Sequence, residues 1–205
     1  MKAQLNWSIL SKFRKEMPNN ILKIPCLEQR QAIPFICKIV SCGARVLDIG
    51  ANDKSMSTHL KSKNVTYKSM DIDKTYKHDF YKLSGIKGTY DAVLMIDIIE
   101  HLTFEESLQY IRKAYQILKP EGKVIFQLPN IFAIGSNQFY DVTHKQFWPY
   151  YDLYSLLRSY GFKKVMVYRL KGRSTKLREA FVFLFCKIFG NHIDYAPNLM
   201  MVAIK

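Results

Sequence analysis

Two histidines stand near acidic residues, at positions where an imidazole could transfer a proton. His101 closes the run Asp97-Ile98-Ile99-Glu100-His101, and His144 follows Asp141 by three residues. Imidazole changes its charge near neutral pH, so it can withdraw a proton from a hydroxyl group. Asp141 could orient the His144 ring, as carboxylates do in other acid–base pairs. His144, His101 and Asp141 are therefore candidate catalytic residues. The ordinary alternatives are a helix-entry role for His101 and a packed aromatic loop around His144.

A second group of residues has the types and spacing of a nucleotide-binding turn. The strand-like run 45–50 ends at Gly50, a helical stretch 55–63 and a second strand 66–70 follow, and Asp71 lies 21 residues beyond Gly50. A carboxylate at that separation can accept hydrogen bonds from both ribose hydroxyls. The sequence thus predicts a strand–turn–helix–strand unit that binds an adenosine-containing ligand.

The composition of this turn discriminates between adenosine ligands. Dinucleotide sites use G-x-G-x-x-G so that backbone N–H groups can approach a pyrophosphate. Here the run 50–55 contains a single glycine, and Asp53 would place negative charge beside that pyrophosphate. S-adenosylmethionine has no phosphate and carries a positive sulfonium, so neither objection applies to it. Asn52 and Asp53 also tolerate positive φ, which allows the turn without more glycines.

Strand-like and helix-like segments alternate along the chain and must position these residues. Thr103 and Glu106 form a capping box for a helix that Pro120 and Gly122 are expected to end. Asp152 is expected to cap a later helix. The residues before Arg45 look helical. The alternation predicts a parallel sheet covered by helices on both faces, with strands at 45–50, 66–70, 92–96, 123–128, 164–170 and 199–204.

Over most of its length the chain resembles class I S-adenosylmethionine-dependent methyltransferases. The runs 46–51, 91–102 and 118–123 are similar to the family's first motif, its fourth strand with an "EHL" ending, and its "LKPGG" turn. The resemblance implies an α/β, Rossmann-like, mostly parallel seven-stranded sheet with helices on both faces and the last strand antiparallel. It implies S-adenosylmethionine as cofactor, no metal, Asp71 on the ribose and Asp79-Phe80 at the adenine. The implied cofactor-binding residues are Asp48, Gly50, Ala51, Asn52, Asp71, Ile72, Asp79, Phe80, Asp97 and Ile98.

One departure concerns the cofactor. The family has glycine where Asn52 and Lys54 stand. Larger side chains there would crowd the methionine end of the cofactor.

A further resemblance concerns the acceptor. The segment 141–162 is similar to the D-x-THxxF…LxxLLxxxGF pattern of methyltransferases often encoded with surface-polysaccharide genes, and the closing run 196–205 is similar too. Aromatic residues crowd the chain around His144, and such side chains can pack on sugar C–H faces. Both features favour O-methylation of a carbohydrate or another small hydroxyl-bearing acceptor.

Two alternatives remain open at this point. The net charge of +14 supports a nucleic-acid methyltransferase. However, Asp97-Ile98-Ile99-Glu100 replaces the Asn/Asp-Pro-Pro-aromatic loop of amino-methylating enzymes, and the one Pro-Cys pair, Pro25-Cys26, is far from the position expected for a C5 nucleophile. The missing glycines motivate the other alternative, a non-catalytic S-adenosylmethionine-binding module.

Length and composition predict a single domain over residues 1–205. Residues 1–43 are expected to form a helical cover and 44–205 the cofactor-binding core, with substrate-side elements at 130–152 and 172–197. We see no signal peptide or CxxC pair, which indicates a reducing, cytoplasmic protein. The apolar residues within 181–189 are expected to be core or a lid, although the basic residues before them also allow peripheral membrane contact.

Overall fold

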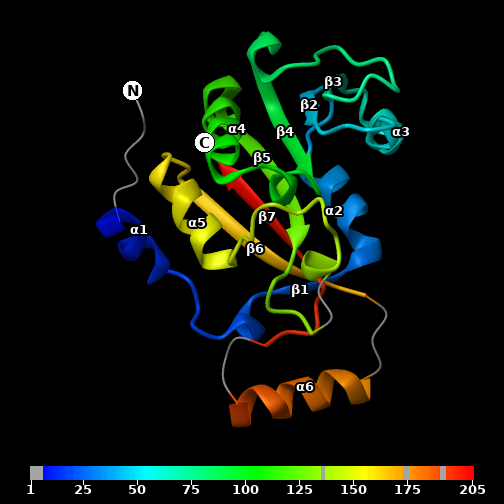
Figure 1. Cartoon of the computed structure of the whole chain (residues 1–205). Helices are drawn as coiled ribbons and strands as arrows, with labels where there is room; N and C mark the ends of the chain where they lie inside the picture. The colour runs from blue at the N-terminus through cyan, green and yellow to red at the C-terminus, as the bar shows by residue number, and fades with distance from the viewer. Residues whose placement is uncertain (1–6, 135–136, 173–175, 190–192) are drawn as a thin grey trace.

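A seven-stranded sheet runs through the structure in the order β1-β6-β7-β5-β4-β2-β3 (Figure 1). The computed structural model describes residues 7–134, 137–172, 176–189 and 193–205. All paired strands are parallel except β7, which runs antiparallel to both β5 and β6. The expected fold class is therefore confirmed. The strands are β1 Cys26–Glu28, β2 Arg45–Ile49, β3 Thr66–Met70, β4 Tyr90–Ile96, β5 Leu118–Pro129, β6 Lys164–Lys171 and β7 Asn198–Ile204.

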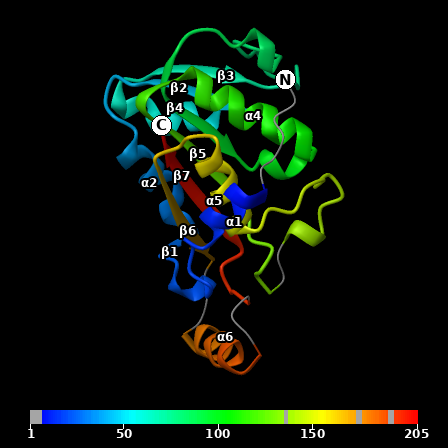
Figure 2. The same cartoon turned by 90° about the vertical axis from the view of Figure 1, so that its left-hand side faces the viewer.

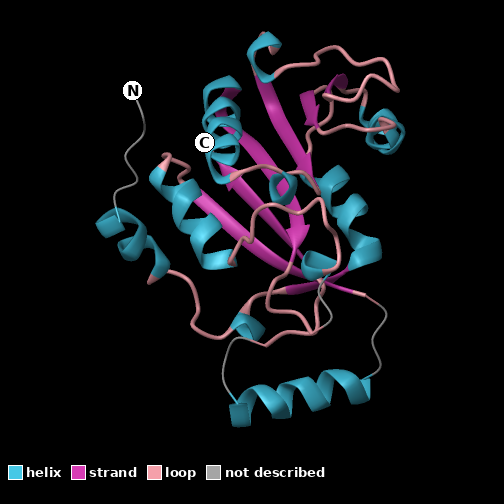
Figure 3. Cartoon of the chain, in the orientation of Figure 1, coloured by secondary structure: helices cyan, strands magenta, loops and turns pink. Residues whose placement is uncertain are grey.

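Helices cover both faces of this sheet, as Figures 2 and 3 show. Helices α1, α4 and α5 pack on one face and α2 and α3 on the other, so the sheet separates two apolar cores. In β4, Val93 and Met95 belong to the first core and Ala92 and Leu94 to the second. Burial on both faces explains why that strand is apolar without alternation. The α-helices are α1 Trp7–Arg14, α2 Ala32–Ile39, α3 Ser55–Leu60, α4 Phe104–Ile117, α5 Tyr150–Ser159 and α6 Lys176–Phe189. Single 3₁₀ turns are η1 Ile21–Lys23, η2 Gln29–Gln31, η3 Lys61–Lys63, η4 Leu83–Gly85, η5 Ile99–His101 and η6 Asn137–Phe139.

The N-terminal region contains a strand as well as helices. Residues 1–43 were expected to form a helical cover, and they also contain the strand β1, which pairs parallel with β6 at the sheet edge. The Arg169 N–H continues this pairing by donating to the Pro25 carbonyl at 2.8 Å. A strand of three residues carries too little periodicity to be read from the sequence, and its partner lies more than 100 residues away.

Two helix boundaries differ from the sequence expectation. The capping box of Thr103 and Glu106 at the start of α4 is confirmed. However, α4 ends at Ile117 and β5 begins at the next residue, so Pro120 and Gly122 lie inside the strand segment. Helix α5 starts after Pro149, which places Asp152 in the first turn and not at the cap. There Asp152 pairs with Arg14 of α1 at 2.5 Å and joins two helices of the same layer.

Helix α6 lies apart from the other helices, beyond the sheet edge that carries β1 (Figures 1 and 2). Its apolar residues were expected to be core or a lid, and the core assignment is wrong for most of the side chains that the structure describes, while the lid stays a prediction. Phe181 is 64% exposed, and Phe183, Leu184 and Ile188 are exposed too, while Val182 is buried. Nothing in the described part of the chain is a helix long and apolar enough to cross a bilayer.

Candidate active site

The turn after β2 is built from residues with left-handed backbone. Gly50, Asn52 and Lys54 have φ angles of +76°, +40° and +60°. Asn52 tolerates this region, as expected, but the other strained position falls on Lys54 instead of Asp53. A Cβ on Gly50 would lie 2.6 Å from Ile98 Cδ1, so close packing also requires glycine there. The Lys54 ammonium donates to the Lys77 carbonyl at 2.8 Å.

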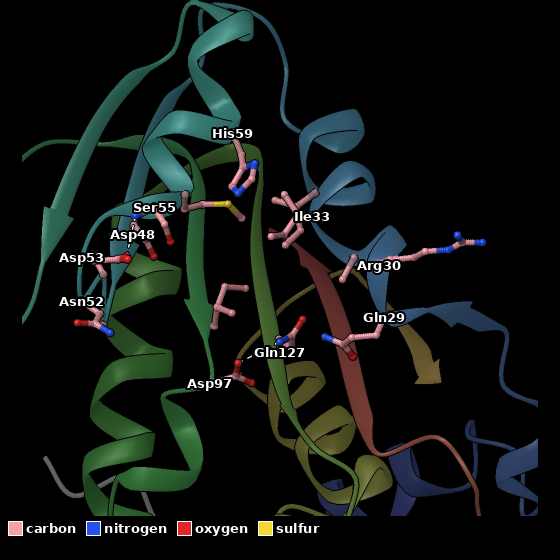
Figure 4. Close-up of a pocket in the computed structure, with 16 residues that line it drawn as sticks. Gln29, Arg30, Ile33, Asp48, Asn52, Asp53, Ser55, His59, Asp97 and Gln127 are labelled. Atoms are coloured by element: carbon pink, nitrogen blue, oxygen red, sulfur yellow. Dashed lines mark hydrogen bonds between the residues drawn. The ribbon is translucent and has the colours of Figure 1, made fainter. Parts of the chain in front are cut away.

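A cavity of about 740 Å³ opens beside this turn, at the carboxyl ends of β2 and β4 (Figure 4). Parallel sheets collect ligands at this edge. The cavity is lined by five of the expected cofactor residues: Asp48, Gly50, Ala51, Asn52 and Asp97. Sequence reasoning missed several further lining residues, whose positions depend on how η2, α2, α3 and β5 pack. They include Gln29, Arg30, Ile33, Ser55, His59 and Gln127.

Figure 4 shows the side of the cavity that lies opposite the turn after β2. The Gln29 side chain extends toward Gln127, whereas the Arg30 guanidinium points away from the cavity. The Arg30 guanidinium pairs with Glu28 instead. The side of the cavity formed by the strand ends and the turn after β2 is acidic, because Asp48, Asp53 and Asp97 line it. The opposite side, at η2 and α2, contributes amide and apolar groups.

Two carboxylates give the cavity its charge, the buried one of Asp48 and the more exposed one of Asp97. Asp48 is 4% exposed, and its Oδ2 accepts a hydrogen bond from the Tyr67 hydroxyl at 2.5 Å. Burial raises the pKa of Asp48 to about 7, against the effect of Tyr67. Burial also raises the pKa of Asp97, whose Oδ2 accepts from Gln127 Nε2 at 3.0 Å. Neither carboxylate forms an ion pair with a described lysine or arginine, so a cationic ligand would be favoured here.

The residues expected at the adenosine end lie outside the lining of this cavity. Asp71 accepts the Asn52 N–H at 2.8 Å through Oδ2 and the Asp73 N–H at 2.9 Å through Oδ1, so it holds the turn in place. Asp79 accepts from Lys68 Nζ at 2.6 Å and from the Ser69 N–H at 2.9 Å. Although burial opposes it, these contacts hold the pKa of Asp79 below its usual range.

The neighbouring apolar residues differ in exposure. Phe80 forms a bridge to Met70 and packs against the first core, whereas Ile72 is 75% exposed. Ile98, the last of the expected cofactor residues, packs on Gly50. The cofactor contacts of Asp71, Ile72, Asp79, Phe80 and Ile98 stay predictions.

The two candidate histidines meet in space. The ring centroids of His101 and His144 lie 4.7 Å apart in an edge-to-face arrangement. Asp141 Oδ2 is 3.7 Å from His144 Nε2, and Asp141 Oδ1 accepts from the Thr143 hydroxyl at 2.6 Å. Thr143 Oγ1 in turn lies 3.0 Å from His101 Nδ1. Two segments more than 40 residues apart thus form one polar cluster next to Asp97.

Glu100 is a member of this cluster that the sequence reasoning did not select. Its side chain is 1% exposed, and burial together with the charges of Asp97 and Asp141 raises its pKa to about 8. Its backbone carbonyl accepts the N–H groups of Lys145 at 2.8 Å and Gln146 at 3.1 Å. The loop that carries His144 is therefore fastened to η5. The signal for Glu100 is its position in the run 97–101, where it directly precedes His101.

Comparison with known proteins fits this geometry. A family model described as "Methyltransferase domain" matches residues 14–167.

The chain belongs to this methyltransferase family. A search of curated proteins finds no match. Among solved structures, this methyltransferase is similar to the SAM-dependent methyltransferase of Archaeoglobus fulgidus, with a TM-score of 0.68, 18% identity and coverage of 98% of this chain and 100% of that chain.

Two further structures are similar at lower scores. The S-adenosylmethionine-dependent methyltransferase of Mesorhizobium loti has a TM-score of 0.62 at 12% identity, covering 86% of this chain and 100% of that chain. Phosphoethanolamine N-methyltransferase 2 of Haemonchus contortus, in complex with S-adenosyl-L-methionine, has a TM-score of 0.58 at 14% identity, covering 100% of this chain and 58% of that chain. At these identities the likeness shows the fold. With the family match, the protein is an S-adenosylmethionine-dependent methyltransferase.

Proposed function

We propose that this methyltransferase O-methylates a carbohydrate or another small hydroxyl-bearing acceptor. The observation that carries the proposal is the His101–His144 pair, with ring centroids 4.7 Å apart beside Asp97. Methyl transfer from a sulfonium needs in-line alignment, and a hydroxyl acceptor also needs a group that takes up its proton. The pair supplies such a group at the sheet edge where ligands collect.

The cofactor is proposed to lie across the turn that follows β2. Its methionine end would occupy the cavity, where the carboxylates of Asp48 and Asp97 face its positive charges. The Asp71 carboxylate would accept hydrogen bonds from the ribose hydroxyls, and Ile72 would cover the adenine. Of the two positions where the family has glycine, Asn52 lines the cavity while Lys54 does not. Crowding of the methionine end would therefore come from Asn52.

The acceptor is proposed to approach from the side of the 130–152 and 172–197 segments. Three aromatic side chains near the histidines are exposed: Phe139, Tyr140 and Phe147. Exposed rings at the mouth of a site can pack on the C–H faces of a sugar. In this scheme 44–205 is the catalytic core and 1–43 is its cover. The cover supplies Gln29 to the cavity wall.

In the direct route, an imidazole withdraws the acceptor proton. The hydroxyl oxygen attacks the methyl carbon, the C–S bond breaks, and the electron pair stays on the now neutral sulfur. Asp141, 3.7 Å from His144 Nε2, would stabilise the protonated ring. His144→Ala and His101→Ala are each expected to lower kcat by about 100-fold or more with small changes in cofactor affinity.

Nucleic acid is the second candidate acceptor because the net charge is +14. A phosphate-binding protein should lose affinity steeply as salt rises. RNA or DNA binding that is saturable at low salt and coupled to methyl transfer would favour this candidate over a sugar.

The test combines cofactor binding with an acceptor screen. Calorimetry with S-adenosylmethionine and S-adenosylhomocysteine is expected to show saturable binding that Asp71→Ala weakens and Asp73→Ala leaves unchanged. Asp73 is the matched control because its exposed carboxylate binds only its own loop, through Thr75. Sugars, phenols, amines and RNA are then compared for formation of S-adenosylhomocysteine. Transfer to amines or RNA but to no hydroxyl would overturn the proposal.

A further inference from the structure

Three side chains with metal-binding atoms meet beside Asp97. Glu100, His101 and His144 each place one candidate ligand atom within 4.8 Å of the others. The first two residues belong to η5, and the third comes from the loop before α5, which two hydrogen bonds fasten to the Glu100 carbonyl. We propose that these three side chains bind one divalent transition-metal ion, of which Zn²⁺ is the best fit. No metal was expected from the sequence.

Glu100 provides the observation that points to a ligand. Its side chain is 1% exposed, and its Oε2 has no hydrogen-bond partner among the described residues. A buried carboxylate oxygen without a partner is costly, and a bound ion is one of the recognised ways to satisfy it. One ligand atom of each of the two imidazoles lies within 4.8 Å of a Glu100 carboxylate oxygen, and imidazole nitrogens can themselves bind a cation. A bound cation would satisfy the buried oxygen and offset the nearby charges of Asp97 and Asp141.

The contacts of the two rings leave a nitrogen of each available. His144 Nδ1 lies 3.3 Å from the Gln138 carbonyl, and His101 Nδ1 lies 3.4 Å from the Thr143 carbonyl. A carbonyl oxygen can only accept, so these contacts favour the proton on Nδ1 and a lone pair on Nε2. Metal-bound histidines in proteins commonly donate their other ring N–H in this way. The 3.7 Å between His144 Nε2 and Asp141 is too long for a hydrogen bond that would occupy that nitrogen.

The donor set selects the class of ion. Two imidazole nitrogens and one carboxylate oxygen suit Zn²⁺ and neighbouring first-row divalent ions better than Mg²⁺ or Ca²⁺, which prefer oxygen ligands. Zn–N and Zn–O bonds of about 2.0–2.2 Å require the ligand atoms, which now lie within 4.8 Å of one another, to approach within about 3.5 Å when the ion binds. Three protein ligands leave a coordination position open, as in catalytic zinc sites.

The open position gives the site a role in methyl transfer, and this step rests on the proposed function. An acceptor hydroxyl bound there would have a lowered pKa and would release its proton to water. The metal-bound oxygen then forms the C–O bond with the methyl carbon as the C–S bond breaks, which yields a methyl ether and S-adenosylhomocysteine. This metal route replaces direct proton transfer to an imidazole, because the ring nitrogens are then occupied.

Direct metal binding tests the site without cofactor or acceptor. The full chain, freed of metal by chelator, is titrated with Zn²⁺ in a calorimeter and with Co²⁺ while its visible absorption is recorded. We expect one saturable site per chain and the absorption of low-coordinate Co²⁺ with nitrogen ligands. Glu100→Gln and His144→Ala are each expected to weaken binding by about 100-fold or more, and Glu105→Gln, an exposed acid on α4, to have no effect.

A milder variant tests the site in case the first two variants do not fold. Thr143→Val removes the hydroxyl that lies 3.0 Å from His101 Nδ1 and is expected to weaken metal binding by about tenfold. Unchanged circular dichroism of each variant shows that the fold is kept. Absence of a saturable site in the wild type, or equal affinity in wild type and Glu100→Gln, would overturn the proposal.

Activity measurements separate the failure of this inference from failure of the proposed function. If a hydroxyl acceptor is found, chelator should abolish its methylation and Zn²⁺ should restore it. Methylation that persists in chelator leaves the proposed function standing and refutes the metal route. A Zn²⁺ site with no methylation of any hydroxyl acceptor has the opposite meaning: the site stands and the proposed acceptor class fails.

Discussion

Replacement of Asp48 by asparagine is expected to stabilise the cofactor-free protein and to weaken its binding of S-adenosylmethionine. The Asp48 carboxyl lies on β2 at the cavity wall, is nearly fully buried and accepts one hydrogen bond from Tyr67. Asparagine has almost the same shape, keeps an oxygen for the Tyr67 hydroxyl and carries no charge. The substitution therefore removes the buried charge with little change in packing.

The pKa of Asp48 sets the magnitude and the sign. Burial raises this pKa from 3.8 to about 7, so the folded protein binds the proton more tightly than the unfolded chain. Because one pKa unit is worth about 1.4 kcal/mol, ionised Asp48 lowers the free energy of unfolding by on the order of 4 kcal/mol at pH 8. This penalty fades as the pH falls through 7 toward 4. The stability advantage of Asp48→Asn should thus shrink from about 4 kcal/mol at pH 8 to about 2 kcal/mol at pH 5.

Urea unfolding at several pH values measures this difference, and calorimetry at pH 6 and pH 8 measures the cofactor affinity. A cationic cofactor favours ionised Asp48, so the affinity of the wild type should rise between these pH values more than that of the variant. Asp91→Asn is the control of opposite sign. Although burial opposes it, the Lys119 ion pair holds the pKa of Asp91 below its usual range, so that variant should lose stability at neutral pH. A stability difference for Asp48→Asn that is absent at pH 8 or constant with pH would refute the reasoning.

Three further substitutions test the framework around the site. Glu121 has a φ of +61° and an exposed side chain, so Glu121→Gly should raise the free energy of unfolding by about 1 kcal/mol in thermal denaturation, whereas Glu121→Ala should not. Gly50→Ala should destabilise the fold by about 1–3 kcal/mol and abolish measurable cofactor binding, because its Cβ would lie 2.6 Å from Ile98. Gly43→Ala, at a φ of +70° with open space around it, is its control and should leave cofactor affinity unchanged. Asp194→Ala should cost about 3–5 kcal/mol in urea unfolding, because it leaves Arg169, its buried ion-pair partner at 2.7 Å, without a counter-charge. A loss of unfolding free energy below about 1 kcal/mol, which is the range of surface ion pairs, would contradict that burial argument.

Local sequence signals sufficed for the elements that hold the cofactor side. The β-branched run ending at Gly50, the capping box of Thr103 and Glu106, and the apolar run of β4 are each complete within a few residues. Such signals act through backbone preference and periodicity, so they can be read without knowing what the segment touches. The resemblance of these same motifs to a methyltransferase family was confirmed by the family match.

Tertiary structure decided everything that depends on two distant segments meeting. Strand β1 exists because residues 26–28 lie against β6, and the Asp79 carboxylate binds Lys68 and Ser69 because the chain folds back on β3. The approach of Glu100 and His101 to His144 likewise follows from how one loop packs on η5. Residue types told which chemistry each side chain can perform, but burial and neighbours set its pKa and its partners. Those are properties of the packed chain. Asp48 and Asp79 are the same residue type, yet burial raises the pKa of Asp48, whereas Lys68 and Ser69 hold the pKa of Asp79 below its usual range.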